Sequence, residues 1–547
     1  MSLQHSKSKR RMLPRWRVSG RASHGGDFAA LRPAAKQPIV IGNPLSRTIE
    51  DFESAHNIGT AAELLSYSLL AGVKESADTA AQFILAHENE APRALVRMAR
   101  AITANTSVIV PQALNEADQV RQTKRLLKLH PDNPMLWSDL SRHFSSHGEH
   151  QRAGRCMKVA LQLAPDHRWM LRTVSRFLVH QDDPIAAHKL LANHPRTRHD
   201  PWLIAAELAC AHVAGRPPKY WRQANDILRF SAVAPLHISE LATAVAMMEL
   251  ESGERKKARK HIQRGLEVPT ENALAQVFWA KENNHLSNGY ELDQLVRTAE
   301  GAYEADYRLS LLQGDIPSAL RAATTWADDE SFAARPRAEI AFIASLLDNH
   351  GLSLEMTRAV HRLQGHTDPT LEMNAIFATL SSGRLTLEND LQDLEKLRFR
   401  LLRTIDQGND IAYHAMANLG LWHYRYGDRS LGRELYQKAI GTSEKLHMLE
   451  TAALAATFAA REAILARDPK SDAVLLQAKE LAKRSKNTAS DFYLRKLDAL
   501  IINPEKAEEI LSPSFVPNLP RVQKKAPAFR IEKNGDRLVV VLPARKT

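Results

Sequence analysis

Residues 137–165, WSDLSRHFSSHGEHQRAGRCMKVALQLAP, carry the pattern that decides the fold. Three large apolar residues are spaced by three and four, as on one face of an α-helix: Trp137, Leu140 and Phe144. Gly148 can adopt a positive φ at little cost and therefore suits the turn after this helix. Ala153 and Ala160 follow on a second stretch, where small side chains let two helices approach closely. The segment predicts a helical hairpin.

The hairpin pattern recurs 34 residues further along the chain without a gap. The aligned positions keep their size class: Trp137 with Leu171, Leu140 with Val174, Phe144 with Leu178, and Ala153 with Ala187. One such hairpin cannot bury its apolar face alone, so neighbouring hairpins stack. The repeat predicts an all-α fold, an α-α superhelical solenoid that is elongated rather than compact.

Residues 137–165 resemble a tetratricopeptide repeat, with Gly148, Ala153, Ala160 and Pro165 at characteristic positions. A second match is formed by Met416, Leu419, Gly420, His423, Gly427, Gly432, Tyr436 and Ala439. Looser matches lie within 245–269 and 340–363. The resemblance implies a scaffold that recognises a protein or peptide in a groove of the solenoid.

The composition is that of an ordinary globular protein, with 44% hydrophobic and 25% charged residues. It excludes collagen-like and wholly disordered chains, and the aromatic content of 6% disfavours an all-β fold. The two cysteines, Cys156 and Cys210, form neither a disulfide framework nor a metal motif, so a reducing compartment is expected. No apolar run approaches the ~20 residues of a membrane span.

Composition and repeats divide the chain into seven predicted segments. These are a basic arm (1–50), the helical N-terminal part of the solenoid (51–133), tetratricopeptide-like repeats (134–272), degenerate repeats (273–412), a further repeat with terminal helices (413–502), a Pro-rich linker (503–527), and a basic tail with a β-hairpin (528–547).

The net charge of +12 is concentrated at the two ends of the chain. Residues 1–48 carry ten basic side chains against one acidic one, and residues 521–547 carry eight against two, which leaves −3 for residues 49–520. Within the arm, phosphate attraction and base stacking would come from five residues: Arg10, Arg11, Arg15, Trp16 and Arg17. The alternatives are an organellar targeting segment and an uncommitted tail.

A loop with the sequence RPPKYWR, residues 216–222, interrupts the turn between two predicted helices. Tyr220, Trp221 and Arg222 are its candidate partner-binding residues, because loops on helical repeats often carry binding. The alternative is that the aromatic side chains only pack against the start of the next helix.

Residues 529–543 predict a β-hairpin with Asn534-Gly535 as its turn. That turn would pair Ile531 with Leu538 and Phe529 with Val540, which places all four on one apolar face. Because two strands alone cannot bury such a face, we expect the hairpin to dock on another surface.

The sequence contains no set of catalytic, cofactor-binding or metal-binding residues that matches a known motif. We therefore expect a non-catalytic scaffold or adaptor without a cofactor, which binds a protein or peptide partner. The alternative is an adaptor whose basic tails hold nucleic acid, and a regulated effector with a cryptic active site ranks last. A cytoplasmic location is expected, with organellar targeting as the alternative.

Overall fold

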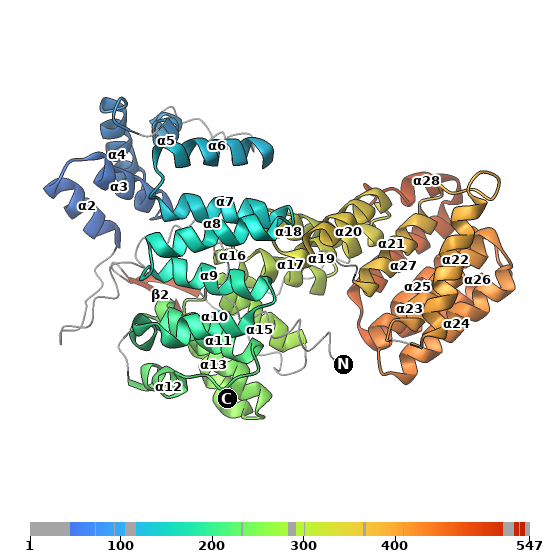
Figure 1. Ribbon diagram of the computed structural model, residues 1–547. Coiled ribbons are helices and arrows are strands. Elements are labelled where there is room, and N and C mark those ends of the chain that lie inside the picture. The colour runs from blue at the N-terminus through green and yellow to red at the C-terminus, as the bar shows by residue number, and fades with distance from the viewer. Residues whose placement is uncertain are drawn as a thin grey trace. The chain divides into compact units, whose positions relative to one another are not determined.

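The computed structural model describes residues 44–71, 73–91, 93–103, 116–230, 233–282, 292–299, 301–364, 368–408, 410–517, 530–534 and 537–541. Apart from two short strands, the regular structure of these residues is helical, and successive helices form antiparallel hairpins (Figure 1). The predicted all-α helical-repeat architecture is confirmed.

The chain forms two compact units. Unit 1 comprises Met1–Ser310, Ser318–Ser345 and His350–Thr379. Unit 2 comprises Leu311–Pro317, Leu346–Asn349 and Leu380–Thr547, so it includes two short turn segments that precede its main part in the sequence.

The helices that lie mainly in unit 1 are α2 (Pro44–Ser54), α3 (Ile58–Ala71), α4 (Lys74–Ala86), α5 (Arg93–Thr103), α6 (Glu116–Leu129), α7 (Pro134–Ser146), α8 (His150–Leu163), α9 (Arg168–His180), α10 (Pro184–Asn193), η3 (Pro195–His199), α11 (Pro201–Val213), α12 (Trp221–Phe230), α13 (Pro235–Glu251), α14 (Arg255–Gly265), α15 (Glu271–Glu282), α16 (Leu292–Thr298), α17 (Tyr303–Leu312), α18 (Ile316–Asp329), α19 (Ala334–Leu346), α20 (His350–Gln364) and α21 (Pro369–Ser381). Those of unit 2 are α22 (Leu391–Asp406), α23 (Ala412–Tyr426), α24 (Arg429–Lys445), α25 (Leu449–Leu465), α26 (Ser471–Ser485), α27 (Thr488–Ile502), η4 (Pro504–Lys506) and α28 (Ala507–Ile510).

Local sequence signals fix the ends of the predicted hairpin α7–α8. The side chain of Asn133 accepts a hydrogen bond from the backbone N–H of Met135 at 3.0 Å, which caps α7 just before Pro134. Gly148 lies in the turn with a φ of +76°. A Cβ there would lie 2.6 Å from the carbonyl oxygen of Arg362, so both the turn and this close approach require glycine.

Small residues hold the two helices of each matched hairpin close together. Ala153 and Ala160 are fully buried, and the Ser141 hydroxyl donates to the carbonyl oxygen of Ala153 at 2.8 Å. In α23–α24, a Cβ on Gly420 would lie 2.9 Å from the carbonyl oxygen of Gly432. Close helix crossings of this kind require the small residues that the repeat pattern supplies.

The strands are β1 (Arg530–Asn534) and β2 (Arg537–Val541), which pair antiparallel. Ile531 lies opposite Val540, and Asn534 lies opposite Arg537. The predicted register is therefore wrong, because it placed Asn534 in the turn and paired Ile531 with Leu538. The pairs of a hairpin are counted outward from its turn. Because Asn534 lies in the ladder and not in the turn, every predicted pair is shifted. The side chains of this segment lie outside the described part, so its docking role stays a prediction.

Candidate functional site

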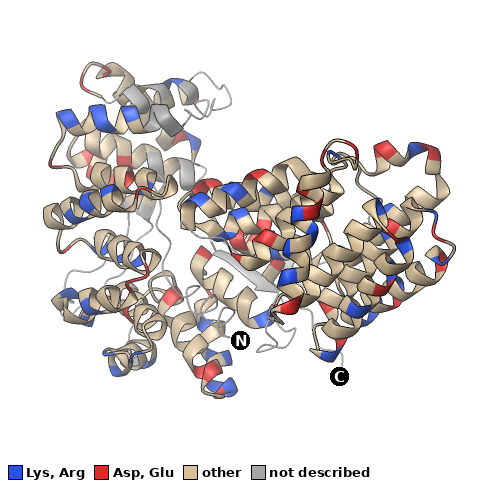
Figure 2. Cartoon of the chain, turned by 45° about the vertical axis from the view of Figure 1, so that its right-hand side comes forward, with Lys and Arg blue, Asp and Glu red and all other residues tan. Residues whose placement is uncertain are grey.

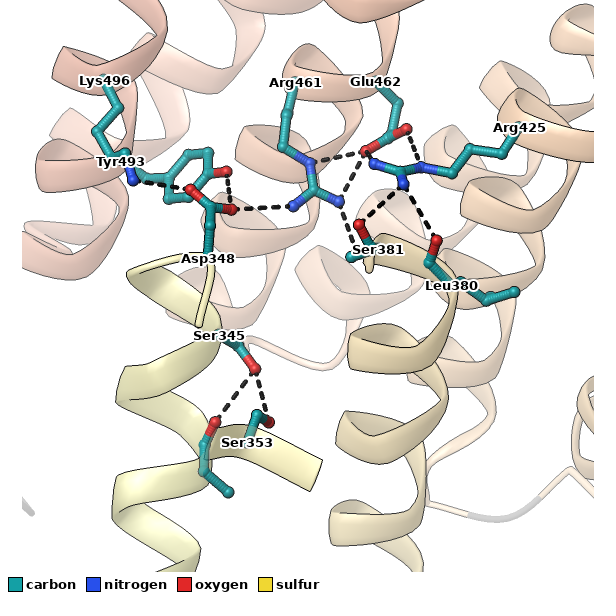
Figure 3. Close-up of polar contacts among 11 residues, drawn as sticks. Ser345, Asp348, Ser353, Leu380, Ser381, Arg425, Arg461, Glu462, Tyr493 and Lys496 are labelled. Carbon is teal, nitrogen blue, oxygen red and sulfur yellow. Dashed lines mark hydrogen bonds and ion pairs between the residues drawn. The ribbon is translucent and has the colours of Figure 1, made fainter. Parts of the chain in front are cut away.

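Polar side chains gather on three helices of unit 2 and on a turn beside them. Helices α23 and α25 are each the first helix of a hairpin, and α27 follows the second hairpin. We call these side chains the Asp348 cluster (Figure 3). Its members are Asp348 from the turn after α19, Arg425 from α23, Arg461 and Glu462 from α25, and Tyr493 and Lys496 from α27.

Three donors hold the Asp348 carboxylate. The Lys496 ammonium lies 2.7 Å from its Oδ2, and the Tyr493 hydroxyl donates to its Oδ1 at 2.6 Å. A guanidinium nitrogen of Arg461 lies 3.6 Å from Oδ1. Asp348 has a φ of +57°, a left-handed conformation that aspartate tolerates better than most residues. The turn is therefore fixed to α25 and α27 by one ionised side chain.

Arg425 and Arg461 form the other half of the cluster. The guanidinium of Arg425 grips both oxygens of Glu462, at 2.8 and 3.0 Å. Its remaining nitrogen donates to the carbonyl oxygens of Leu380 and Ser381, at 3.1 and 3.0 Å, where α21 ends. Unsatisfied carbonyls at a helix C-terminus favour a cation, so Arg425 ties the end of α21 to α23 and α25.

Burial makes these charges depend on one another. The side chains of Lys496 and Arg461 are 0% and 2% exposed. Burial lowers the pKa of Lys496, and the Asp348 carboxylate acts in the opposite direction. Burial alone would raise the pKa of Glu462, but Arg461 and Arg425 outweigh it and hold that pKa below its ordinary value. The cluster is a closed structural tie, because its carboxylate-binding groups are already occupied by the chain itself.

Unit 1 contains a smaller tie of the same kind. Arg142 of α7 donates to the Ser331 hydroxyl at 2.6 Å, and Arg176 of α9 lies 3.3 Å from a Glu330 oxygen. The Arg176 guanidinium also lies over the ring of Phe332, at 6.0 Å from its centroid. The turn after α18 is therefore held by two successive repeats, and the acidic side chain of Glu330 acts as an ion-pair partner there.

An open groove lies between α24 and α26, the second helices of two successive hairpins in unit 2. Its volume is about 470 Å³, and its lining residues are Ser430, Arg433, Glu434, Gln437, Lys470, Ala473, Val474 and Gln477. The side-chain amides of Gln437 and Gln477 bond to each other across it, at 2.7 and 3.1 Å. The groove combines side-chain amides, both signs of charge and a small apolar floor.

The loop residues predicted to bind a partner have separate environments. Tyr220 is 7% exposed, and its hydroxyl donates to the carbonyl oxygen of Ala192 at 3.1 Å. Trp221 packs against the same core, whereas Arg222 is exposed. Both aromatic residues therefore belong to the core, and of the three predicted residues only Arg222 is exposed. A binding role for this loop stays a prediction.

The other predicted site residues lie outside the described part of the chain. Arg10, Arg11, Arg15, Trp16 and Arg17 fall in the N-terminal arm, and Phe529 in the C-terminal tail. The backbones of Ile531, Leu538 and Val540 are described but their side chains are not. The proposed roles of both ends stay predictions.

Sequence reasoning missed both the Asp348 cluster and the groove. Asp348 and Lys496 are 148 residues apart, and no local motif connects them. The sequence held one indirect signal, the charged pair Arg461-Glu462 in an otherwise alanine-rich stretch. Charged side chains that are buried need partners inside the protein.

These features define an all-α protein built of stacked helical hairpins, whose sequence pattern resembles tetratricopeptide repeats. No protein-family profile matches the sequence, and no curated protein matches it significantly. Among solved structures, the chain is similar to the APC/C hetero-tetramer Cut9–Hcn1, with 13% identity, a TM-score of 0.32, and coverage of 85% of this chain and 92% of that one. It is also similar to yeast Tom70, with 14% identity, a TM-score of 0.26, and coverage of 72% and 95%.

Within the described residues, no helix has both the length and the apolar character that crossing a membrane requires.

Proposed function

We propose that this protein is a non-catalytic scaffold that binds a protein partner in the groove between α24 and α26. The observation that carries the proposal is the groove itself, in which Gln437 is exposed and its bridging partner Gln477 is partly exposed. Their amides donate and accept, so they can exchange their mutual bonds for bonds to a peptide backbone. A cytoplasmic location belongs to the same proposal.

The charges along the groove suit an extended segment with both signs of charge. Arg433 is anchored by Asp468, which in turn accepts from the Tyr424 hydroxyl at 3.2 Å. Glu434 pairs with Lys438 at 2.8 Å in the exposed surface, where such a pair contributes little and is easily exchanged. Val474 is buried and gives the floor an apolar contact. A partner would therefore contact the fixed guanidinium of Arg433 and side chains that can exchange their present bonds, namely Glu434 and the two glutamines.

Site-specific photo-crosslinking in the full chain tests this proposal. A photoreactive amino acid is placed at Gln437 or Gln477, with Glu505, which is exposed on η4, as the control position. We expect the two groove positions to capture the same protein, and Glu505 not to capture it. Equal labelling from all three positions would overturn the proposal.

A second measurement uses the partner that the groove captures. Replacing both Gln437 and Gln477 with Ala should weaken its binding by about tenfold, because the lost amides leave peptide groups without partners. Unchanged affinity would place the binding surface elsewhere on the scaffold.

A further inference from the structure

Helix α14 differs from the rest of the body in its charge. Its sequence, RKKARKHIQRG, holds six Lys or Arg residues and no Asp or Glu. Along most other helices both signs of charge are mixed (Figure 2). Helices α5, α8 and α9 also lack Asp and Glu, but each holds only three Lys or Arg residues. The net −3 of residues 49–520 therefore conceals one strongly basic helix.

The basic side chains face solvent because the opposite face of α14 is fixed to the core. Ala258 and Ile262 are fully buried, and Gly265 is packed so closely that a Cβ would lie 2.7 Å from the Thr243 methyl of α13. Five basic residues are exposed and Arg264 is partly buried: Arg255, Lys256, Lys257, Arg259 and Lys260. At 100° per residue, Lys256 and Lys260 lie at the centre of the exposed face.

Ion pairs do not account for four of the six basic residues of α14. Lys257 lies 3.4 Å from Glu254, but within the described part of the chain Arg255, Lys256, Lys260 and Arg264 form no ion pair. The nearby carboxylates of Glu249 and Glu251 contact His261 and His212, at 3.7 and 3.2 Å.

The cations also oppose the helix that carries them. Three pairs of like charge stand at i and i+4, namely 255 with 259, 256 with 260, and 260 with 264. Each such pair destabilises a helix by a few tenths of a kcal/mol. Burial lowers the pKa of His261, and Lys260, Arg264 and Arg229 of α12 lower it further, so the positive potential extends to the neighbouring repeat. A surface that costs stability and stays rigid fits a ligand of opposite charge.

The shape and composition of α14 select among polyanions. Its exposed face has no aromatic or large aliphatic side chain, whereas a membrane-surface helix needs an apolar face towards the bilayer. It is a ridge rather than a groove, and its Arg side chains offer the paired donors that match phosphate. At 1.5 Å per residue it is roughly 16 Å long, enough to follow several phosphates of a nucleic-acid strand.

We propose that the exposed face of α14 binds the phosphate backbone of nucleic acid. Without aromatic side chains for stacking, binding depends on charge and carries little sequence preference. This inference goes beyond the proposed protein-binding groove in unit 2, and it does not depend on the N-terminal arm.

Fluorescence titration of the full chain with a labelled duplex at several salt concentrations tests the proposal. Lys256→Gln with Lys260→Gln should weaken binding at least tenfold near 0.1 M salt. The slope of log affinity against log salt should fall by about 2, which is two lost phosphate contacts. The control is Lys479→Gln with Lys483→Gln, an exposed pair of the same spacing on α26 in which Lys479 pairs with Asp498 at 2.7 Å. It should change neither quantity.

Three results would overturn the proposal: no duplex binding by the unchanged protein, equal losses in both double variants, or a loss only when residues 1–48 are deleted. Tighter binding of a polyglutamate peptide than of the duplex to the same lysines would assign the surface to an acidic protein instead. Matching circular dichroism melts of the two double variants ensure that lost binding is not lost folding.

Discussion

The Asp348 cluster of unit 2 and helix α14 of unit 1 use the same residue types in opposite ways. In the cluster, five charged side chains lie together and each contacts an opposite charge. On α14, by contrast, four cations form no ion pair within the described residues, and the helix has no carboxylate of its own. Buried charges must be compensated inside the protein, whereas exposed charges can be left for a partner. The comparison separates charges that specify the fold from charges that specify an interaction.

The largest effect should come from removing the charge of Asp348. Asp348→Asn keeps the shape and the tolerance for a positive φ but leaves Lys496 buried without its carboxylate, whereas Arg461 retains Glu462. Breaking one partner of a buried pair costs about 3–5 kcal/mol. Hydrogen exchange of α27 should therefore accelerate strongly.

Asp182 provides a matched control for Asp348. It occupies the corresponding turn after α9 with a φ of +59°, but its side chain is exposed. Asp182→Asn should change stability by no more than about 0.5 kcal/mol. Equal effects of the two variants would show that the turn conformation, and not the buried charge, is what matters at Asp348.

A buried histidine in unit 1 sharpens the comparison, because it is buried without charge. Burial, with Arg142 and His147 adding to it, lowers the pKa of His143 from 6.5 to about 4. The unfolded chain therefore takes up this proton first as the pH falls. Stability should decrease between pH 6.5 and 4, by about 3 kcal/mol for this group at 1.36 kcal/mol per pKa unit.

Chemical denaturation across this pH range checks the effect. His143→Gln should remove that part of the acid sensitivity, while His130→Gln, which changes an exposed histidine, should retain it. If the two variants follow the same pH profile, His143 does not resist protonation in the folded state.

The sequence predicted the hairpins but not the contacts between distant turns and helices. The difference lies in how far apart in the sequence the contacting residues are. Ala153 and Gly420 act within one hairpin, as does the turn role of Gly148, and there the spacing alone indicates which positions must be small. The approach of Gly148 to Arg362 of α20 lies outside that range. The Asp348 cluster joins three helices to turns about 45 to 150 residues away, and no period encodes such a contact. Helix α14 was visible as a basic run, but averaging charge over residues 49–520 concealed it.

The smallest effect expected is a gain in stability on α14. Lys256→Glu removes the repulsion between Lys256 and Lys260 and replaces it with a Glu–Lys pair at i and i+4 in the favourable order. The new carboxylate also lies in the first turn of the helix, where a negative charge is stabilising. We expect a gain of about 0.5–1 kcal/mol, against the large loss at Asp348.

Thermal unfolding of Lys256→Glu beside Lys256→Gln measures this gain and separates its two sources, because Gln removes the repulsion without forming the new pair. The Glu variant should be the more stable of the two and also the weaker binder of duplex nucleic acid. Stability and binding should change in opposite directions here, because the same like-charged side chains that bind the ligand lower the stability of the helix. A loss of stability in both variants would instead show that Lys256 holds the fold together, and the contrast between α14 and the Asp348 cluster would then fail.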